Sequence, residues 1–249
     1  SLEHPHILPL YTFGTTEGYT YFAMRYSCMG SLADLLKGGP LSIEQALDFA
    51  AQISSALAFL HARGVVHRDL KPDNVLLDSR QQVYLSDFGL ARELGSETNI
   101  LHTGRGTEAY ASFEQHNRMG MVPQSDIYSL GILIYEMLAG KLPWGGTESL
   151  ASRQYQGYEE LPDLHETNAE IPETFAAAVR RLTAFHWSER PFTVMDAYQL
   201  VAQALVPQSG PHLGAMQIPE PVAEERLALM DADHLLQMFL TSWRPDVEE

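Results

Sequence analysis

The chain has 249 residues, of which 45% are hydrophobic and 19% charged, an ordinary globular composition that suits one large domain or two small ones. Acidic residues outnumber basic ones by 32 to 16, giving a formal net charge of −16. This balance argues against a nucleic-acid partner, because phosphate backbones are bound by clustered Lys and Arg, and we interpret the acidity as a contribution to solubility.

Cysteine content and hydropathy indicate a reducing, aqueous compartment. Cys28 is the only cysteine, so no intrachain disulfide can form, and we read it as an ordinary thiol. The opening SLEHPHILPL lacks the pattern of a signal peptide, and no stretch approaches 18 uninterrupted apolar residues. We expect a cytoplasmic location and no membrane segment in this chain, which leaves open a membrane anchor elsewhere in a longer protein.

The first part of the chain predicts a β hairpin followed by a helix. Residues 7–26 carry β-branched and aromatic runs on either side of a glycine-rich turn at 14–18. Residues 42–64 begin with Ser-x-Glu, end at a glycine and place apolar residues at helical spacing. The predicted buried face consists of Ile43, Leu47, Ala50, Ser54, Leu57 and Leu60.

The rest of the chain alternates short strands, a long loop and further helices. Two short strands are expected at 74–77 and 83–86, and residues 87–122 form a polar, glycine-dotted loop, a kind that is usually functional or disordered. Helices are expected at 125–140, 171–186 and 193–206, a proline-containing linker at 207–221, and a last segment at 222–243. That last segment is either an amphipathic helix or a disordered acidic tail, and the pattern favours neither.

One ordered set of polar residues carries the chemistry. Residues 67–74 read HRDLKPDN, and Asp87-Phe88-Gly89 begins thirteen positions after Asn74. Eight residues are taken as fixed: His67, Arg68, Asp69, Lys71, Asn74, Asp87, Phe88 and Gly89. At roughly 1 in 20 for each of them, the chance of this set is about 10⁻¹⁰ for each start position. It resembles the catalytic loop H-R-D-x-x-x-x-N and the metal-binding D-F-G of the protein kinase family, and within it the form of the bacterial eukaryotic-like serine/threonine kinases.

The resemblance implies an α+β fold that is mainly α, namely a protein-kinase-like C-lobe with a remnant N-lobe β hairpin. It implies two regions, residues 1–30 as remnant N-lobe strands and hinge and 31–206 as the C-lobe. Residues 207–249, which the resemblance does not cover, form a third region, the proline-containing linker and candidate amphipathic helix. Within the C-lobe, residues 67–74 would be the catalytic loop and 87–114 the activation segment.

By the same resemblance, the activity is phosphorylation of Ser or Thr on protein substrates with ATP and Mg²⁺. Asp69 would orient the substrate hydroxyl and accept its proton, and Lys71 would stabilise charge on the transferring phosphoryl group. Asn74 and Asp87 would supply oxygen ligands for Mg²⁺. A lone aspartate in a turn is more often a structural carboxylate, but the ordered set favours the catalytic role. His67 is expected to be packed in the core.

A second stretch, YFAMRYSCMGSL at residues 21–32, resembles the strand, hinge and helix start that line the adenine pocket of protein kinases. Met24 would be the gatekeeper, and the backbone of Arg25 and Ser27 would bond the adenine edge. Leu76 would pack under the ring. Met24 and Leu76 would also be acceptable as ordinary core residues. The family more often has Glu where Arg25 stands, but a main-chain contact tolerates that change.

The resemblance also assigns structural and regulatory residues. Glu114 and Arg190 would form a buried ion pair, although Phe113 stands where the family usually has proline, and Asp126 would lie in the central helix of the lobe. The regulatory residues would be Arg68, Thr103 as a phosphorylation site and Thr107 as a hydroxyl that bonds the catalytic loop.

Protein kinases carry a Gly-rich loop and a strand lysine before the hinge. This sequence shows no such loop there, and its three lysines, Lys37, Lys71 and Lys141, all follow the hinge. We therefore expect an N-terminally truncated kinase domain, weakly active or inactive alone, whose missing N-lobe lies upstream in the full gene product. Two alternatives are a non-catalytic kinase-like scaffold or binding protein and an unrelated helical interaction domain. The retained catalytic residues argue against the first, and the ordered motifs argue against the second.

Overall fold

The structure is a computed structural model, and the residues that it describes belong to one compact unit, Ser1–Pro207. The described residues are 3–16, 19–87, 107–117, 122–143, 149, 151 and 161–205. The predicted linker and last helix at 207–249 lie outside them, as does most of the predicted activation segment.

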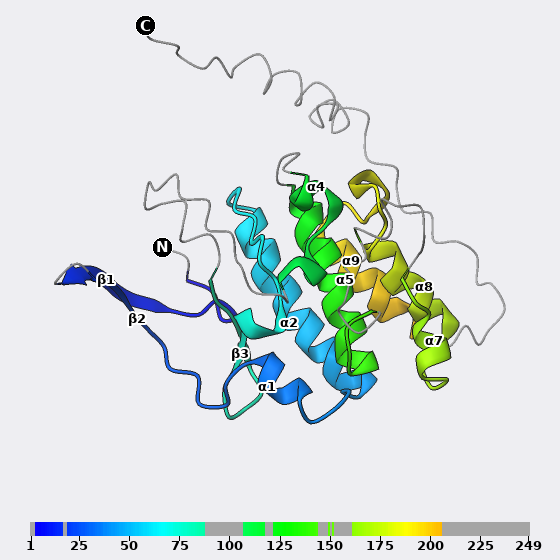
Figure 1. Ribbon diagram of the computed structural model, residues 1–249, viewed down its shortest axis with the longest axis horizontal. Coiled ribbons are helices and arrows are strands. Elements are labelled where there is room, and N and C mark those ends of the chain that lie inside the picture. The colour runs from blue at the N-terminus through cyan, green and yellow to red at the C-terminus, as the bar shows by residue number, and fades with distance from the viewer. Residues whose placement is uncertain are drawn as a thin grey trace, which may run out of the picture. The chain divides into compact units, whose positions relative to one another are not determined.

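The predicted hairpin is present as strands β1 (Leu10–Thr16) and β2 (Tyr19–Met24), which pair antiparallel. Figure 1 shows it extending to one side of the helices. The prediction of a turn starting at Gly14 is wrong, because Gly14 lies within β1 opposite Tyr21. A side chain at Gly14 would meet the Tyr21 ring at 2.7–3.0 Å, so the glycine serves cross-strand packing.

The two short strands predicted after the catalytic loop are confirmed as β3 (Val75–Leu77) and β4 (Val83–Leu85), again antiparallel. Two isolated bridges extend this pair, one from Ile7 to Leu85 and one from Ser31 to Leu76. Ser31 is also the N-cap of the short helix α1 (Leu32–Leu36). The strands therefore join the first segment, the hinge and the catalytic loop.

Helix α2 (Ile43–His61) forms because Ser42 caps it and one of its faces is apolar. The Ser42 side chain accepts from the backbone N–H of Gln45 at 3.2 Å. The buried stripe is centred differently from the prediction, since Phe49 and Ile53 are fully buried while Ile43 and Leu47 are only partly covered. The remaining predicted positions of the stripe are buried: Ala50, Ser54, Leu57 and Leu60.

Helix α5 (Pro123–Ala139) is the centre of the core, and nearly all of its residues are buried. It begins with proline at its first position and ends at Gly140, whose φ of 68° is left-handed. Around it pack α2, α8 (Glu173–Leu182) and α9 (Val194–Gln203), with the short α7 (Leu164–Thr167) against α8 (Figure 1). Shorter elements are η1 (Pro72–Asn74), η2 (Thr107–Tyr110), α4 (Phe113–His116) and η4 (Trp187–Glu189).

This architecture agrees with the predicted fold class at the level of mixed α and β content in which helices predominate. The prediction of one loop over 87–122 is partly wrong, because η2 and α4 lie in its described part. Both are short elements that a helical hydrophobic period cannot indicate.

A glycine sets how closely α5 approaches the end of α8. A Cβ at Gly131 would lie 2.7 Å from the Thr183 Cγ2 and 2.9 Å from the Leu182 Cβ. We expect Gly131→Ala to destabilise the protein by about 1–3 kcal/mol despite the better helix propensity of alanine, because the buried neighbours must shift. Urea unfolding measures this, and adding Thr183→Ser, which removes the contacting methyl, should recover part of the loss. A variant as stable as the parent would contradict this account of the packing.

Candidate active site

Three side chains of the predicted catalytic loop are in contact. Lys71 Nζ lies 2.8 Å from Asp69 Oδ2. Asn74 Nδ2 donates to the same oxygen at 2.8 Å and to the Asp69 carbonyl at 2.7 Å, because the η1 turn returns Asn74 to Asp69. Within the described residues Oδ1 has no hydrogen bond, so it is the oxygen available to accept a proton.

One buried carboxylate holds the backbone of this loop. Asp126, in the first turn of α5, has no exposed surface. Its Oδ2 accepts from the backbone N–H of His67 at 2.8 Å and its Oδ1 from that of Arg68 at 2.9 Å. His61 Nε2 lies 2.7 Å from Oδ2. The contacts compensate the burial of the charge and hold Arg68 at φ 73°, a left-handed conformation that costs a non-glycine residue about 1–2 kcal/mol.

His67 is packed as predicted, with 1% of its surface exposed. Its Nε2 lies 3.0 Å from the Ser86 carbonyl, and its Nδ1 lies 3.3 Å from the Asp69 backbone N–H. A carbonyl only accepts and a backbone N–H only donates, so the neutral tautomer with the proton on Nε2 satisfies both contacts. Burial, which outweighs the nearby carboxylates, lowers the pKa of His67, and the ring therefore serves as a neutral spacer between the loop and β4.

The two predicted metal ligands are linked through the end of β4. Ser86 N–H donates to the Asn74 carbonyl at 2.9 Å and its hydroxyl donates there at 3.2 Å, and Asp87 follows directly. Because the Asn74 amide nitrogen donates to Asp69, its side-chain oxygen is the group left to bind a cation. The described residues contain no cluster of three His, Cys, Asp or Glu side chains suited to a metal. One amide and one carboxylate fit Mg²⁺, which takes few protein ligands and completes its shell with phosphate and water oxygens.

The predicted hinge residues lie beside β3. The Ser27 hydroxyl donates to the Leu77 carbonyl, and Met29 N–H donates to the same carbonyl at 3.3 Å. Arg25 is fixed by its N–H, which donates to the Pro9 carbonyl at 3.0 Å, while its guanidinium lies 4.9 Å from the centre of the Tyr84 ring. These contacts bring the hinge against the strand that carries Leu76. Met24 at the end of β2 is 41% exposed, so it is not an ordinary core residue.

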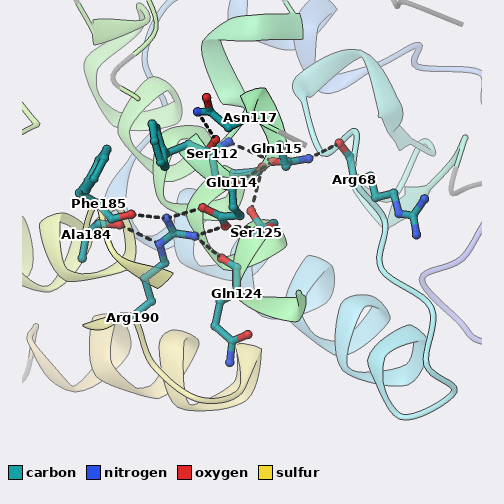
Figure 2. Close-up of polar contacts among 12 residues, drawn as sticks. Arg68, Ser112, Glu114, Gln115, Asn117, Gln124, Ser125, Ala184, Phe185 and Arg190 are labelled. Carbon is teal, nitrogen blue, oxygen red and sulfur yellow. Dashed lines mark hydrogen bonds and ion pairs between the residues drawn. The ribbon is translucent and has the colours of Figure 1, made fainter. Parts of the chain in front are cut away.

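The predicted buried ion pair is present and is part of a larger network (Figure 2). Arg190 donates to Glu114 at 2.6 and 3.2 Å, and Ser125 Oγ donates to Glu114 at 2.8 Å. Arg190 also donates to the carbonyls of Gln124, Ala184 and Phe185. Burial opposes ionisation of Glu114, but the hydrogen bonds and charge of Arg190 outweigh it and hold the pKa of Glu114 below its usual range.

Phe113, which stands where the family usually has proline, leaves the local turn intact. Ser112 is extended at the N-cap of α4, and its N–H and hydroxyl donate to the Gln115 side-chain oxygen at 3.0 and 3.1 Å. The Phe113 ring packs against the Phe185 ring with centroids 4.5 Å apart. The helix start is therefore supported by Gln115 and by an aromatic contact.

Two predicted regulatory positions are not described in full. Thr103 lies outside the described residues, and Thr107 begins η2 but its side chain is not described. The prediction of a phosphorylated Thr103 therefore stays a prediction.

Sequence reasoning missed three contacts that involve the catalytic loop or helix α5. His61 contacts Asp126, and Gln115 Nε2 donates to the Arg68 carbonyl at 2.8 Å. Tyr110 donates to Glu136 at 2.5 Å, and burial raises the pKa of Glu136. Each partner is at least 26 positions away, so a single sequence carried no signal for them.

Comparisons with known proteins agree with this geometry. A protein kinase domain model matches residues 1–208. The chain is 34% identical over 186 residues to the probable serine/threonine-protein kinase PknB of Lactococcus lactis, covering 74% of this chain and 30% of that protein. It is 34% identical over 187 residues to the serine/threonine-protein kinase PrkC of Bacillus subtilis, covering 74% and 29%, and 40% identical over 146 residues to the CBL-interacting protein kinase 10 of rice, covering 57% and 32%.

The chain belongs to the protein kinase domain family, and the resemblance drawn from its motifs, including that to bacterial serine/threonine kinases, is confirmed. Members of this family in general use ATP and divalent metal ions. The chain spans less than a third of the length of these three relatives. None of the helices in the described ranges has the length and apolarity that crossing a bilayer requires.

Asp126 offers a direct test of what holds the loop. In Asp126→Asn, one of the two backbone N–H groups would face an amide NH₂, so we expect a loss of about 3 kcal/mol in the free energy of unfolding. Urea denaturation followed by circular dichroism measures it. His61→Gln, which leaves both backbone bonds to Asp126 in place, should cost clearly less, and equal losses in the two variants would contradict the assigned role.

The ion pair predicts an acid-sensitive stability. Because the pKa of Glu114 is lowered on folding, the pair contributes fully above the ordinary glutamate pKa of about 4.3, and this contribution is lost as pH falls through the lower folded value. Urea midpoints from pH 7 to pH 3 should therefore decline less steeply in Glu114→Gln, which also loses about 3–5 kcal/mol at pH 7. The exposed Glu166 changed to Gln is the control and should keep the parental slope. Parallel slopes for the parent and Glu114→Gln would refute the prediction.

Proposed function

We propose that this chain is the C-lobe, hinge and neighbouring hairpin of a protein serine/threonine kinase, which transfers a phosphoryl group from ATP to Ser or Thr of protein substrates. The observation that carries the proposal is the contact of Lys71 and Asn74 with one oxygen of Asp69, together with the bonds that Ser86, the residue before Asp87, donates to the Asn74 carbonyl. The names of the relatives PknB and PrkC support the same activity.

The geometry suits general-base and electrostatic roles. Lys71 and Asn74 fix Asp69 Oδ2, so Oδ1 can orient the substrate hydroxyl and take its proton. The Lys71 ammonium, anchored on Asp69, would stabilise charge on the transferring group. Lysine two positions after the catalytic aspartate is typical of serine/threonine kinases and favours those substrates.

Nucleotide and metal would be held by the hinge and by the end of β4. The backbone carbonyl of Arg25 and the N–H of Ser27 would bind the adenine edge, with Met24 and Leu76 on its sides. Asn74 and Asp87 would hold Mg²⁺, which supplies neutralisation of phosphate charge when bound.

The regulatory part of the proposal rests on sequence. A phosphate on Thr103 would add about −1.5 to −2 charge and order the activation segment by pairing with Arg68. The Thr107 hydroxyl would bond the catalytic loop and would be needed unmodified.

The test uses the protein made from its full coding sequence, with Mg-ATP and a generic protein substrate rich in Ser and Thr. Asp69→Asn should reduce kcat by at least about a thousandfold while nucleotide affinity stays within a factor of about three, because only the proton acceptor changes. Asp87→Asn should instead raise the Mg²⁺ concentration needed for nucleotide binding. Asp48→Asn, at an exposed position outside the loop, is the matched control. Mg-ATP binding without turnover in the parent would support the non-catalytic scaffold, and equal turnover in Asp69→Asn would reject the assignment.

A further inference from the structure

The residue before Asp69 is held at both of its backbone polar groups. Arg68 has the left-handed φ of 73°, and its N–H is accepted by Asp126. Its carbonyl accepts from Gln115 Nε2 at 2.8 Å. The two bonds come from different elements, α5 and α4, so the conformation of Arg68 depends on both.

The Gln115 amide is oriented by its partners. Its oxygen accepts from the N–H and hydroxyl of Ser112, and its nitrogen donates to the Arg68 carbonyl. Because a carbonyl only accepts and an N–H only donates, the opposite orientation of the amide would break the bonds to the Ser112 N–H and to the Arg68 carbonyl. Figure 2 shows the side chain of Gln115 directed at the Arg68 carbonyl, while the Arg68 side chain points away from it.

The bond acts on the peptide that leads to Asp69. The Arg68 carbonyl and the Asp69 N–H belong to one planar unit. Gln115 binds the carbonyl side of this plane, and His67 Nδ1 accepts from the N–H side at 3.3 Å. The N–Cα bond of Asp69 lies in this plane, so we expect a change in the orientation of the plane to move the Asp69 side chain.

Helix α4, which carries Gln115, is itself held in place by two further contacts. Glu114, the neighbour of Gln115, is paired with Arg190, and Phe113 packs against Phe185. Gln115 therefore projects from a segment that is anchored to the late part of the lobe.

We propose that Gln115 is a positioning residue that couples the placement of α4 to the orientation of the Arg68–Asp69 peptide and so sets the turnover rate. The proposal rests on the kinase activity proposed above. It assigns to Gln115 a role beyond supporting the start of α4, which its bonds to Ser112 alone would provide.

Two substitutions separate these roles. Gln115→Glu keeps an oxygen acceptor for Ser112 but places a carboxylate oxygen against the Arg68 carbonyl. Ser112→Ala removes the hydroxyl donor of the helix start and leaves the bond from Gln115 to Arg68 in place. If the positioning role holds, Gln115→Glu lowers kcat about ten- to a hundredfold with little change in KM for ATP or substrate, whereas Ser112→Ala changes kcat less than threefold.

A second measurement does not depend on activity. Amide hydrogen exchange at residues 67–69 should be at least about tenfold faster in Gln115→Glu than in Ser112→Ala, with the melting temperatures of both variants compared in parallel. If the parent enzyme shows no turnover, the proposed function fails and exchange alone decides whether Gln115 orients the peptide. Unchanged exchange and kcat in Gln115→Glu, or equal effects in the two variants, would overturn the proposal.

Discussion

The buried carboxylate of Asp126 is the contact on which the candidate site depends. It lies at the start of the most buried helix of the described core and accepts two consecutive backbone N–H groups from the catalytic loop. A charge in this position is tolerable only because its donors replace water. These bonds hold Arg68 in a conformation that an L-residue seldom adopts, directly before Asp69, which contacts Lys71 and Asn74.

A second anchor lies next to the first, because Ser125, the neighbour of Asp126, donates to Glu114. The Glu114–Arg190 pair joins α4 to the segment before α9, and Arg190 also satisfies three carbonyls. Replacing such a pair by apolar residues is often neutral for stability, whereas removing one partner is not. The pair is therefore better described as a source of conformational specificity than of stability, because it fixes the place where Gln115 contacts the catalytic loop.

The placement of Asp69 depends on residues of its own loop and on residues far from it in the sequence. Asp69 is oriented by the ammonium of Lys71 and the amide of Asn74, while the backbone before it is held from α5 and α4. The His67 ring contacts the Ser86 carbonyl just after β4. This arrangement suits phosphoryl transfer, in which positioning and charge neutralisation carry most of the catalysis. It also means that substitutions far from Asp69 in sequence can alter turnover.

The sequence by itself determined the family, the helices around 43–61 and 123–139, the short strands at 75–77 and 83–85, and the residue types of the site. It could do so because hydrophobic period, capping residues and the spacing of the motif are local properties. The position of Gly14 within β1, the stripe centred on Phe49 and Ile53, and the short helix α4 were decided by tertiary structure. So were the contacts of Asp126 and Gln115 with the loop and that of His61 with Asp126, because hydrogen bonds between residues 47 to 65 positions apart exist only after the core has packed.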